Sequence, residues 1–246
     1  MERENIRDEA IVLHVKNWQT ADKYAVCFTK EHGKLRFVAY GARYVKNVRG
    51  RLLQPFACLQ IEVQQGQRID KLSGCELIEI PKAMDMRQMA YGAVAAELTA
   101  VLTEDRQPQP ELYELLRLTL KLITERNPRL TVLAFAIRLL ELTGFAPQMD
   151  ACVCCGRPAE EEGDCMFSPL QGGIVCGSCG GDGLESCGAG TRRLWRQLQQ
   201  LDFENPQPFS VRGGDLMELE RLLYRFIFFQ TDKPLNSLNF LSQLNL

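Results

Sequence analysis

The stretch from Cys152 to Cys179 reads CVCCGRPAEEEGDCMFSPLQGGIVCGSC and holds two pairs of cysteines, each with two residues between its members. The first pair is Cys152 and Cys155, and the second pair is Cys176 and Cys179, twenty residues further on. A two-residue spacer lets two sulfur atoms converge on one ion, and the glycine after each pair suits a tight turn. Four thiolates close a tetrahedral site and leave no position for substrate. The spacing therefore predicts one structural zinc ion bound by these four cysteines.

The residues between the two pairs fit a small zinc ribbon. Residues 167–169 and 172–175 form two short extended segments around a glycine-containing turn. Cys154 could replace Cys152 or Cys155 only by distorting the two-residue spacing, so we expect it to lie beside the site as a spare thiol. Cys165 and Cys187 lack a partner pair at ligand spacing, and we expect neither to be a ligand. The alternative interpretation is a loop of free thiols that has lost its metal.

Length and composition are those of an ordinary soluble protein. The chain has 246 residues, enough for two or three small domains, and 46 % of them are hydrophobic. No run of eighteen apolar residues exists, and the charged start MERENIRDEAIVLHV lacks the apolar core of a signal peptide. Ten cysteines, four of them assigned to a metal, indicate a reducing compartment. We therefore expect a cytoplasmic protein with no membrane partner.

The net charge of −2 conceals an uneven distribution. Residues 30–51 contain seven Lys or Arg and one Glu, a net charge of +6. Residues 150–188 contain seven acidic residues and one Arg, a net charge of −6. A local field of one sign attracts a polyanion whatever the global sum, so the basic stretch indicates a nucleic-acid partner.

Residues 8–80 have the pattern of β-strands. Extended runs occur at residues 10–15, 24–29, 35–40, 56–63 and 70–78. In the fourth run, apolar residues from Ala57 to Val63 occupy every second position, which is the period of a half-buried strand. Five short strands without a long helix predict a small closed β-barrel of the OB type, with a sandwich as the alternative topology.

The segment from Gly41 to Arg51 lies between the third and fourth strands and is basic, with a glycine near each end. On a five-stranded barrel, cationic loops follow a phosphate backbone. We predict that six basic residues contact the phosphates of a nucleic acid, namely Lys34, Arg36, Arg43, Lys46, Arg49 and Arg51. The alternative is that these charges only solvate a mobile loop.

After Pro81 the periodicity becomes helical, apart from the cysteine-rich stretch. Apolar residues at three- and four-residue spacing predict helices at 86–102, 111–125, 128–142, 191–201 and 215–229. Asp215 and Glu218 predict a capping box at the start of the last helix. The expected fold is α+β, with an OB-type barrel at residues 1–80 and an all-helical domain at 81–246, interrupted by a four-cysteine zinc module at about 150–188.

The residue patterns of several enzyme classes are missing. The two histidines, His14 and His32, lie in no motif with a Ser or Cys nucleophile. The phosphate-binding pattern G-x4-G-K-[ST] and the zinc deaminase signature are absent from the sequence. We therefore expect no enzymatic activity and no small-molecule substrate.

Several short motifs occur in order along most of the chain. They are DEAIVL at 8–13, ADKY at 21–24, TKEHGKL at 29–35, VAYGAR at 38–43, LQPF at 53–56, LTGFAP at 142–147 and FSP at 167–169 with GG at 172–173. Together they resemble the bacterial recombination mediator family RecO. The chain departs from the family pattern at Tyr40, where a basic residue is usual, and near Asn47, where a serine is usual.

This resemblance implies a non-enzymatic mediator of DNA repair and homologous recombination. Members of the family bind single- and double-stranded DNA, anneal complementary strands and act with RecR. With RecR they help RecA replace single-stranded DNA-binding protein (SSB), whose C-terminal tail they recognise through the helical domain. Two other functions stay open: an RNA-binding zinc protein with the same barrel, and a non-catalytic adaptor for protein interactions.

Overall fold

The computed structural model describes residues 5–80, 82–160 and 162–243. Its backbone contacts divide the chain into two compact units, residues 1–132 with 236–246 and residues 133–235. One helix, α4 (Pro128–Leu142), spans the boundary between them in the sequence. Among the described residues, no helix is both long and apolar enough to cross a membrane.

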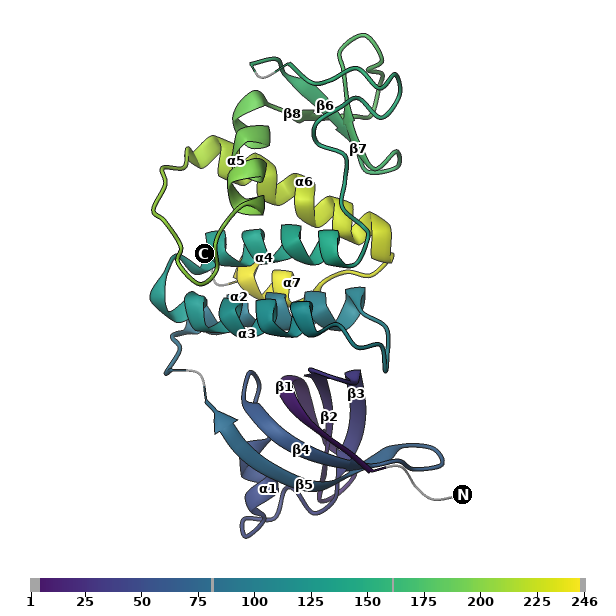
Figure 1. The fold of residues 1–246 in the computed structure, drawn as a ribbon, viewed down its shortest axis with the longest axis vertical. Coiled ribbons are helices and arrows are strands. Elements are labelled where there is room, and N and C mark those ends of the chain that lie inside the picture. The colour runs from purple at the N-terminus through teal and green to yellow at the C-terminus, as the bar shows by residue number, and fades with distance from the viewer. Residues whose placement is uncertain (1–4, 81, 161, 244–246) are drawn as a thin grey trace. The chain divides into compact units, whose positions relative to one another are not determined.

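The first unit contains a closed β-barrel whose strands follow one another in the order β1-β2-β3-β5-β4 (Figure 1). Strands β3 and β5 pair in parallel, and every other neighbouring pair is antiparallel. This closed barrel confirms the five strands that the alternation predicted. The strands are β1 (Asn5–Trp18), β2 (Asp22–Thr29), β3 (Gly33–Ala39), β4 (Cys58–Gln64) and β5 (Asp70–Glu79).

Strand β4 shows how the alternating pattern builds the barrel. Leu59, Ile61 and Val63 are fully buried in the barrel core, whereas Glu62 is exposed. Cys58 departs from the pattern because it is buried on the outer side of the strand, where its sulfur lies 3.2 Å from the Tyr113 hydroxyl. The outside of the barrel is therefore covered in part by the helices of the same unit.

Besides the short helix α1 (Val48–Leu52), the first unit contains three longer helices beside the barrel. Helix α2 (Met86–Leu102) begins with a capping box formed by Asp85 and Gln88, and α3 (Pro110–Glu125) has a proline in its first turn. The third helix, α7 (Asn236–Gln243), has no counterpart in the sequence prediction. The Glu97 carboxylate on α2 accepts hydrogen bonds from the backbone amides of Asn236, at 3.0 Å, and Ser237, at 2.8 Å, which holds the start of α7.

The second unit contains α5 (Ala189–Gln199), α6 (Gly213–Thr231) and a three-stranded sheet with the order β7-β6-β8. The predicted capping box of α6 is wrong. Because the helix begins at Gly213, Asp215 lies in its first turn and is not the N-cap. Glu218 binds elsewhere, accepting hydrogen bonds from the Gly188 amide, at 2.9 Å, and from the Thr191 hydroxyl at the start of α5.

The small sheet carries the cysteine-rich stretch. Strands β6 (Cys165–Ser168) and β7 (Gly173–Val175) pair across a turn, as the sequence predicts for a ribbon. A third strand, β8 (Glu185–Cys187), pairs with the other edge of β6 and was not predicted. The polar residue Glu185 is buried in this strand, which is an environment that a three-residue pattern does not reveal.

Candidate nucleic-acid interface and metal centre

The basic segment, residues 41–51, contains a short helix, α1 (Val48–Leu52), where the sequence predicted only a loop. Asn47 is its N-cap: the side chain accepts a hydrogen bond from the Gly50 amide at 3.2 Å and donates one to the Gly41 carbonyl at 3.0 Å. The Lys23 ammonium donates to the Gly50 carbonyl at 2.6 Å. Specific hydrogen bonds from residues outside the helix therefore hold the basic segment in place.

Gly50 lets α1 pack closely against the preceding chain. A Cβ atom at this position would lie 1.7 Å from the carbonyl oxygen of Ala42, which is shorter than any van der Waals contact. Both residues are buried. The shape of the basic segment therefore requires glycine here because of space, since the backbone of Gly50 has no positive φ.

Four of the six predicted DNA contacts lie on this segment and are exposed: Arg43, Lys46, Arg49 and Arg51. Arg43 donates to the Thr20 carbonyl at 2.8 Å, and Arg49 donates to the Ser73 carbonyl at 2.6 Å. Within the described residues, the side chains of Lys46 and Arg51 make no hydrogen bond or ion pair. The two guanidinium groups thus also brace the barrel, whereas Lys46 and Arg51 offer unengaged charge.

Lys34 has a different environment from the other predicted contacts. Its side chain is only 4 % exposed, and its ammonium donates to the carbonyls of Ala100, at 2.6 Å, and Thr103, at 2.5 Å. These carbonyls end α2, where the helix dipole favours a cation. Burial lowers the pKa of Lys34, while Asp105 at 3.4 Å acts in the opposite direction. The ammonium is therefore enclosed at the end of α2, and the contact of Lys34 with DNA stays a prediction.

Arg36, the sixth predicted contact, lies at a cleft of about 340 Å³ on the outside of the barrel. It forms an ion pair with Asp105 at 2.9 Å, and Arg106 forms one with Asp70 at 2.5 Å. Arg68, in the loop between β4 and β5, also lines the cleft, and its side chain makes no hydrogen bond or ion pair within the described part of the chain. The cleft is therefore polar, with one uncompensated arginine.

An aromatic pair next to this cleft was missed in the sequence. The rings of Trp18, at the end of β1, and Tyr24, in β2, lie with centroids 5.6 Å apart. The Lys16 ammonium lies 5.7 Å from the Trp18 ring centre and 5.1 Å from the Tyr24 ring centre. The cluster arises from strand register, because Lys16 is opposite Tyr24 and Trp18 is opposite Asp22 in the β1–β2 ladder. No local spacing rule signals such a cluster.

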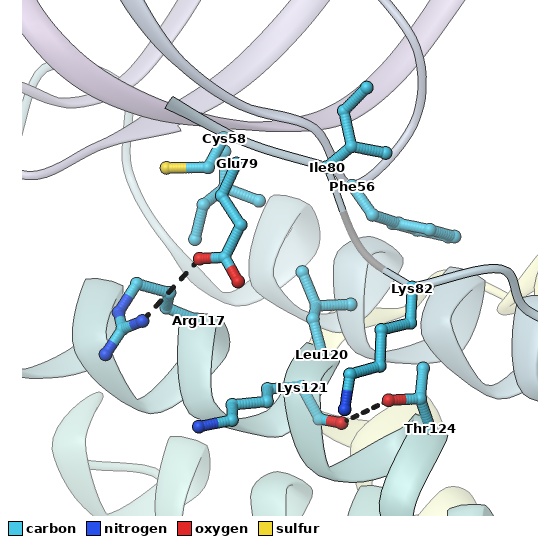
Figure 2. Close-up of a pocket in the computed structure, with 10 residues that line it drawn as sticks. Phe56, Cys58, Glu79, Ile80, Lys82, Arg117, Leu120, Lys121 and Thr124 are labelled. Carbon is cyan, nitrogen blue, oxygen red and sulfur yellow. Dashed lines mark hydrogen bonds and ion pairs between the residues drawn. The ribbon is translucent and has the colours of Figure 1, made fainter. Parts of the chain in front are cut away.

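A small pocket of about 90 Å³ lies in the same unit, between the barrel and α3 (Figure 2). Apolar side chains such as Ile80 and Leu120 line it, with charged groups beside them. Glu79 and Arg117 approach each other at 3.8 Å, and Arg117 is also bound by Glu114. None of the residues predicted as functional from the sequence lies in this pocket.

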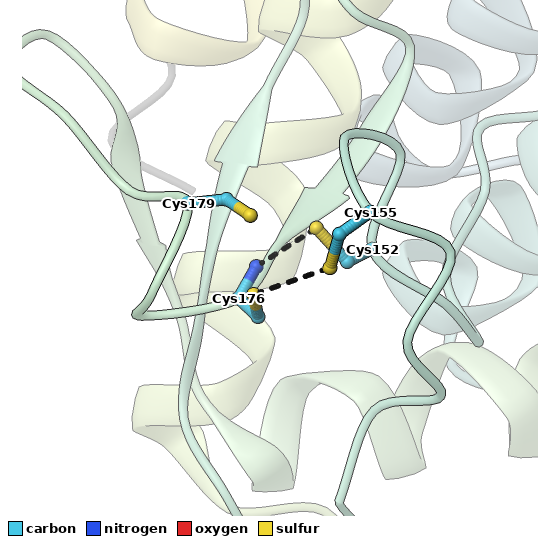
Figure 3. A group of neighbouring side chains, drawn as sticks. All are labelled: Cys152, Cys155, Cys176 and Cys179. Atoms are coloured by element: carbon cyan, nitrogen blue, oxygen red, sulfur yellow. Dashed lines mark hydrogen bonds between the residues drawn. The ribbon is translucent and has the colours of Figure 1, made fainter.

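The four predicted metal ligands converge in the second unit, with all their sulfur atoms within 4.8 Å of one another (Figure 3). Cys155 and Cys176 have their sulfurs 3.8 Å apart. In a tetrahedral zinc–thiolate site with bonds of about 2.3 Å, the sulfurs lie about 3.8 Å apart. The donor set and its spacing therefore fit one tetrahedrally bound ion, as the sequence predicted for Cys152, Cys155, Cys176 and Cys179.

Two turns bring the cysteines together. In the first turn, the Gly156 amide donates to the Cys152 carbonyl at 2.8 Å, and Gly156 has a φ of +72°, which a glycine adopts without strain. In the second turn, the Cys179 amide donates to the Cys176 carbonyl at 3.0 Å. Gly180 has no positive φ, so the expected need for glycine holds for the first turn and not for the second.

The protonation of the cluster favours a cation at its centre. The Cys176 amide points at the Cys152 sulfur, and this hydrogen bond is the main cause that lowers the pKa of Cys152 to about 6. The Cys179 amide likewise lowers the pKa of Cys176. Hydrogen bonds with Cys155 and Cys176 raise the pKa of Cys179 to about 12. A divalent cation at the centre of the group lowers the pKa of all four thiols, because it stabilises their thiolate forms.

The remaining cysteines of the region stay outside this group. Cys154 is exposed, with its sulfur 3.4 Å from the side-chain oxygen of Gln171. Cys165 and Cys187 face each other across β6 and β8 and are both buried. Burial raises the pKa of Cys187 to about 12, so this thiol stays protonated near neutral pH.

The acidic character of residues 150–188 is largely neutralised in the fold. Arginines of α5 and α6 supply the partners, which a count over the segment alone does not include. The ion pairs are Asp150 with Arg196 at 3.0 Å, Glu162 with Arg193 at 2.6 Å, and Glu185 with Arg221 at 2.9 Å and Arg225 at 2.8 Å. The local charge of −6 derived from the sequence therefore overstates the field of this module.

Comparison with known proteins covers nearly the whole chain. The family described as "Recombination protein O N terminal" matches residues 1–81, and "Recombination protein O C terminal" matches residues 83–239. A DNA repair protein RecO from Symbiobacterium thermophilum is 34 % identical over 96 % of this chain and 96 % of its own length. The DNA repair protein RecO of Cutibacterium acnes is 29 % identical over 96 % of this chain and 98 % of its own.

Proposed function

The chain belongs to the RecO family of DNA repair proteins, and from this premise we propose that it is a recombination mediator that binds DNA through its barrel. The binding is phosphate-led and independent of base sequence. The observation that carries the proposal is the basic segment: Lys46 and Arg51 project unengaged charge beside Arg43 and Arg49 on a five-stranded barrel. Phosphate contacts of this kind position a nucleic acid without reading its bases.

Family membership supports a finer role as part of this proposal. The chain binds single- and double-stranded DNA, anneals complementary strands and, with RecR, helps RecA replace SSB on single-stranded DNA. Recognition of the SSB tail belongs to this role, and no residue is assigned to it. Annealing consumes no nucleotide, so the proposed function is non-enzymatic and requires no phosphate-cradling loop.

The proposed cofactor is one structural zinc ion held by Cys152, Cys155, Cys176 and Cys179. When bound, the ion cross-links the two turns that carry these cysteines. Four protein ligands leave no position for water or substrate, so the role of the site is to hold the module together. The protein supplies backbone amides that lower the pKa of Cys152 and of Cys176, which favours the thiolate form of both.

The proposal is tested by titrating the full chain into labelled single-stranded oligonucleotides of two unrelated sequences and measuring fluorescence anisotropy at low and moderate salt. We expect similar affinities for both sequences, and binding that weakens steeply with salt. Unlabelled RNA and duplex DNA serve as competitors. Absence of binding at low salt would contradict the proposal and favour a protein adaptor, and a strong preference for RNA would favour an RNA-binding protein.

A further inference from the structure

We propose that Trp18 and Tyr24 form a base-stacking site for single-stranded nucleic acid on the outer face of the barrel. This inference rests on the proposed function, because it concerns the same ligand, and it adds a site that recognises unpaired bases. The site lies at the end of β1 and the start of β2, apart from the basic segment in sequence. Its ligand is a single strand whose bases are free to stack.

The first argument is the position of the two rings outside the barrel core. Ala25 and Cys27 of β2 belong to the barrel core, so Tyr24, one position before Ala25, points to the opposite, outer face. Trp18 is 37 % exposed although tryptophan is a large apolar side chain. Packing the barrel core does not explain these rings, because both lie outside it.

The second argument is the cation that accompanies the rings. The exposed Lys16 ammonium lies within 6 Å of both ring centres. A second aromatic–cation pair lies on the same barrel, where Tyr40 is 53 % exposed and the Lys71 ammonium is 5.6 Å from its ring centre. Rings that stack bases next to cations that neutralise phosphates are the combination found in single-strand binding sites.

The third argument is the position of the rings on the barrel. Barrels of this type bind oligonucleotides across strands 2 and 3 and the loops between strands 1 and 2 and strands 4 and 5. Trp18 and Tyr24 flank the β1–β2 turn, and Tyr24 also lines the 340 Å³ cleft with Arg36 and Arg68. Arg68 comes from the β4–β5 loop and makes no ion pair among the described residues, so it is available to a phosphate.

The fourth argument is continuity with the basic segment. The Arg43 guanidinium donates to the Thr20 carbonyl at 2.8 Å, and the Arg43 amide donates to the Ala21 carbonyl at 2.9 Å. The basic segment is therefore bonded to the β1–β2 turn that separates Trp18 from Tyr24. One strand can contact the basic segment with its phosphates and the aromatic pair with its bases.

This arrangement gives the two surfaces different roles. Phosphate contacts act on single and double strands alike, whereas stacking on a side chain requires bases that are not already stacked and paired. The aromatic pair therefore confers a preference for single strands. Its removal lowers the affinity for single strands and leaves the salt dependence unchanged, because no phosphate contact is lost.

The test compares oligothymidylate with an abasic oligomer of the same length and charge, in a buffer of low salt. Wild-type protein should bind oligothymidylate about tenfold more tightly than the abasic oligomer, since one base stack contributes about that factor. Tryptophan fluorescence should be quenched by oligothymidylate only. Trp195 is 4 % exposed and lies in the other unit, so the quenching reports on Trp18. Trp18→Phe should abolish it.

The matched variants separate stacking from folding. Trp18→Ala/Tyr24→Ala should bind oligothymidylate about tenfold more weakly, with an unchanged salt slope and unchanged duplex affinity. Trp18→Phe/Tyr24→Phe keeps two rings and should retain the preference. Phe228→Ala removes an aromatic residue that is 49 % exposed on α6 and should change nothing. Circular dichroism and the melting temperature show whether each variant is folded.

Two results would overturn the proposal. Equal affinity of the wild-type protein for the two oligomers, without quenching, would refute the stacking site and leave the proposed function intact. Binding of neither oligomer at low salt would refute both.

Discussion

The basic segment of the barrel and the cysteine module are both short, irregular regions rich in one kind of side chain, yet they are held in opposite ways. In the basic segment, hydrogen bonds of Asn47, Gly50 and Lys23 maintain the structure. The side chains of Lys46 and Arg51 make no hydrogen bond or ion pair with another described residue. In the module, the four cysteines themselves join the two turns. We therefore expect that the charges of the basic segment can be removed without unfolding the barrel. Removal of the cysteines should instead unfold the module.

The difference follows from the number of buried apolar residues against which each region packs. The basic segment rests on a barrel whose buried residues form one cluster, and Ala42 and Leu53 belong to that cluster. The module has strands of three or four residues. Such short strands bury too little apolar surface to offset the loss of chain entropy, which supports the proposal that a metal cross-link holds them.

The largest expected effect concerns the metal. Cys155→Ser/Cys176→Ser, or strong chelation, should unfold the module and release one zinc ion per chain, because structural zinc supplies roughly 10–16 kcal/mol to small domains. The barrel should keep its fold and its DNA affinity. Hydrogen exchange of residues 150–188 and a zinc-sensitive dye measure the two quantities. Cys154→Ser is the matched control and should retain the ion, since Cys154 lies outside the group.

The comparison would fail if the purified protein bound no zinc, or if the double serine variant protected the module from exchange as well as the wild type does.

The second effect concerns Lys34, a basic residue whose ammonium is buried and bound by backbone carbonyls. Lys34→Met should lower the free energy of unfolding by about 3 kcal/mol, because the Ala100 and Thr103 carbonyls lose a charged donor in a buried site. Arg36→Met is the control, and loss of its half-exposed ion pair with Asp105 should cost less than about 1 kcal/mol. Urea unfolding measures both, and equal costs would contradict the assignment.

The third effect concerns the support of the basic segment. Gly50→Ala should destabilise the barrel by about 1–3 kcal/mol, because the new methyl group meets the Ala42 carbonyl. It should also weaken DNA binding by displacing α1. Gly214→Ala in α6 is the control: nothing lies within 4 Å of its Cβ position, so alanine should be neutral or stabilising. A Gly50→Ala variant as stable as the wild type would show that α1 does not depend on this contact.

The smallest effect on stability is expected for Lys46 and Arg51, the two residues whose replacement should weaken DNA binding. Lys46→Glu/Arg51→Glu should change the free energy of unfolding by less than about 0.5 kcal/mol, since neither side chain has a partner among the described residues. Its affinity for DNA should fall at least about tenfold. Arg87→Glu/Lys233→Glu reverses the same number of exposed charges, on α2 and on the loop between α6 and α7, and should leave the affinity nearly unchanged. Thermal melting measures the change in stability, and fluorescence anisotropy measures the change in DNA affinity.

The sequence predicted the parts of the fold that have a clear local period. Alternation in residues 57–63 predicts a strand because neighbouring side chains face the core and the solvent in turn. Helices α1 and α7 were missed because they have five and eight residues, too few to show a helical period. Their stability depends on tertiary contacts: the close approach of Gly50 to Ala42 for α1, and the distant Glu97 carboxylate for α7.

The same distinction applies to the candidate sites. The cysteine group was predicted because ligand spacing is local to two turns. The burial of Lys34 depends on the end of α2, whose Ala100 lies 66 residues further along the chain. The residues around Lys34 in the sequence therefore gave no sign that its charge is buried. Trp18 and Tyr24 meet through strand register, which is decided by the whole barrel. Local patterns thus identify ligands, whereas packing determines which charges and rings remain accessible.

The most direct test is the salt dependence of single-strand binding by the wild type and by Lys46→Glu/Arg51→Glu, measured by anisotropy over a series of salt concentrations. If each residue neutralises one phosphate, the slope of log K against log salt should become less steep by about 1.4 in the variant, at about 0.7 per contact. The Arg87→Glu/Lys233→Glu control should keep the wild-type slope. An equal slope in the wild type and the Lys46→Glu/Arg51→Glu variant would show that the basic segment does not contact DNA.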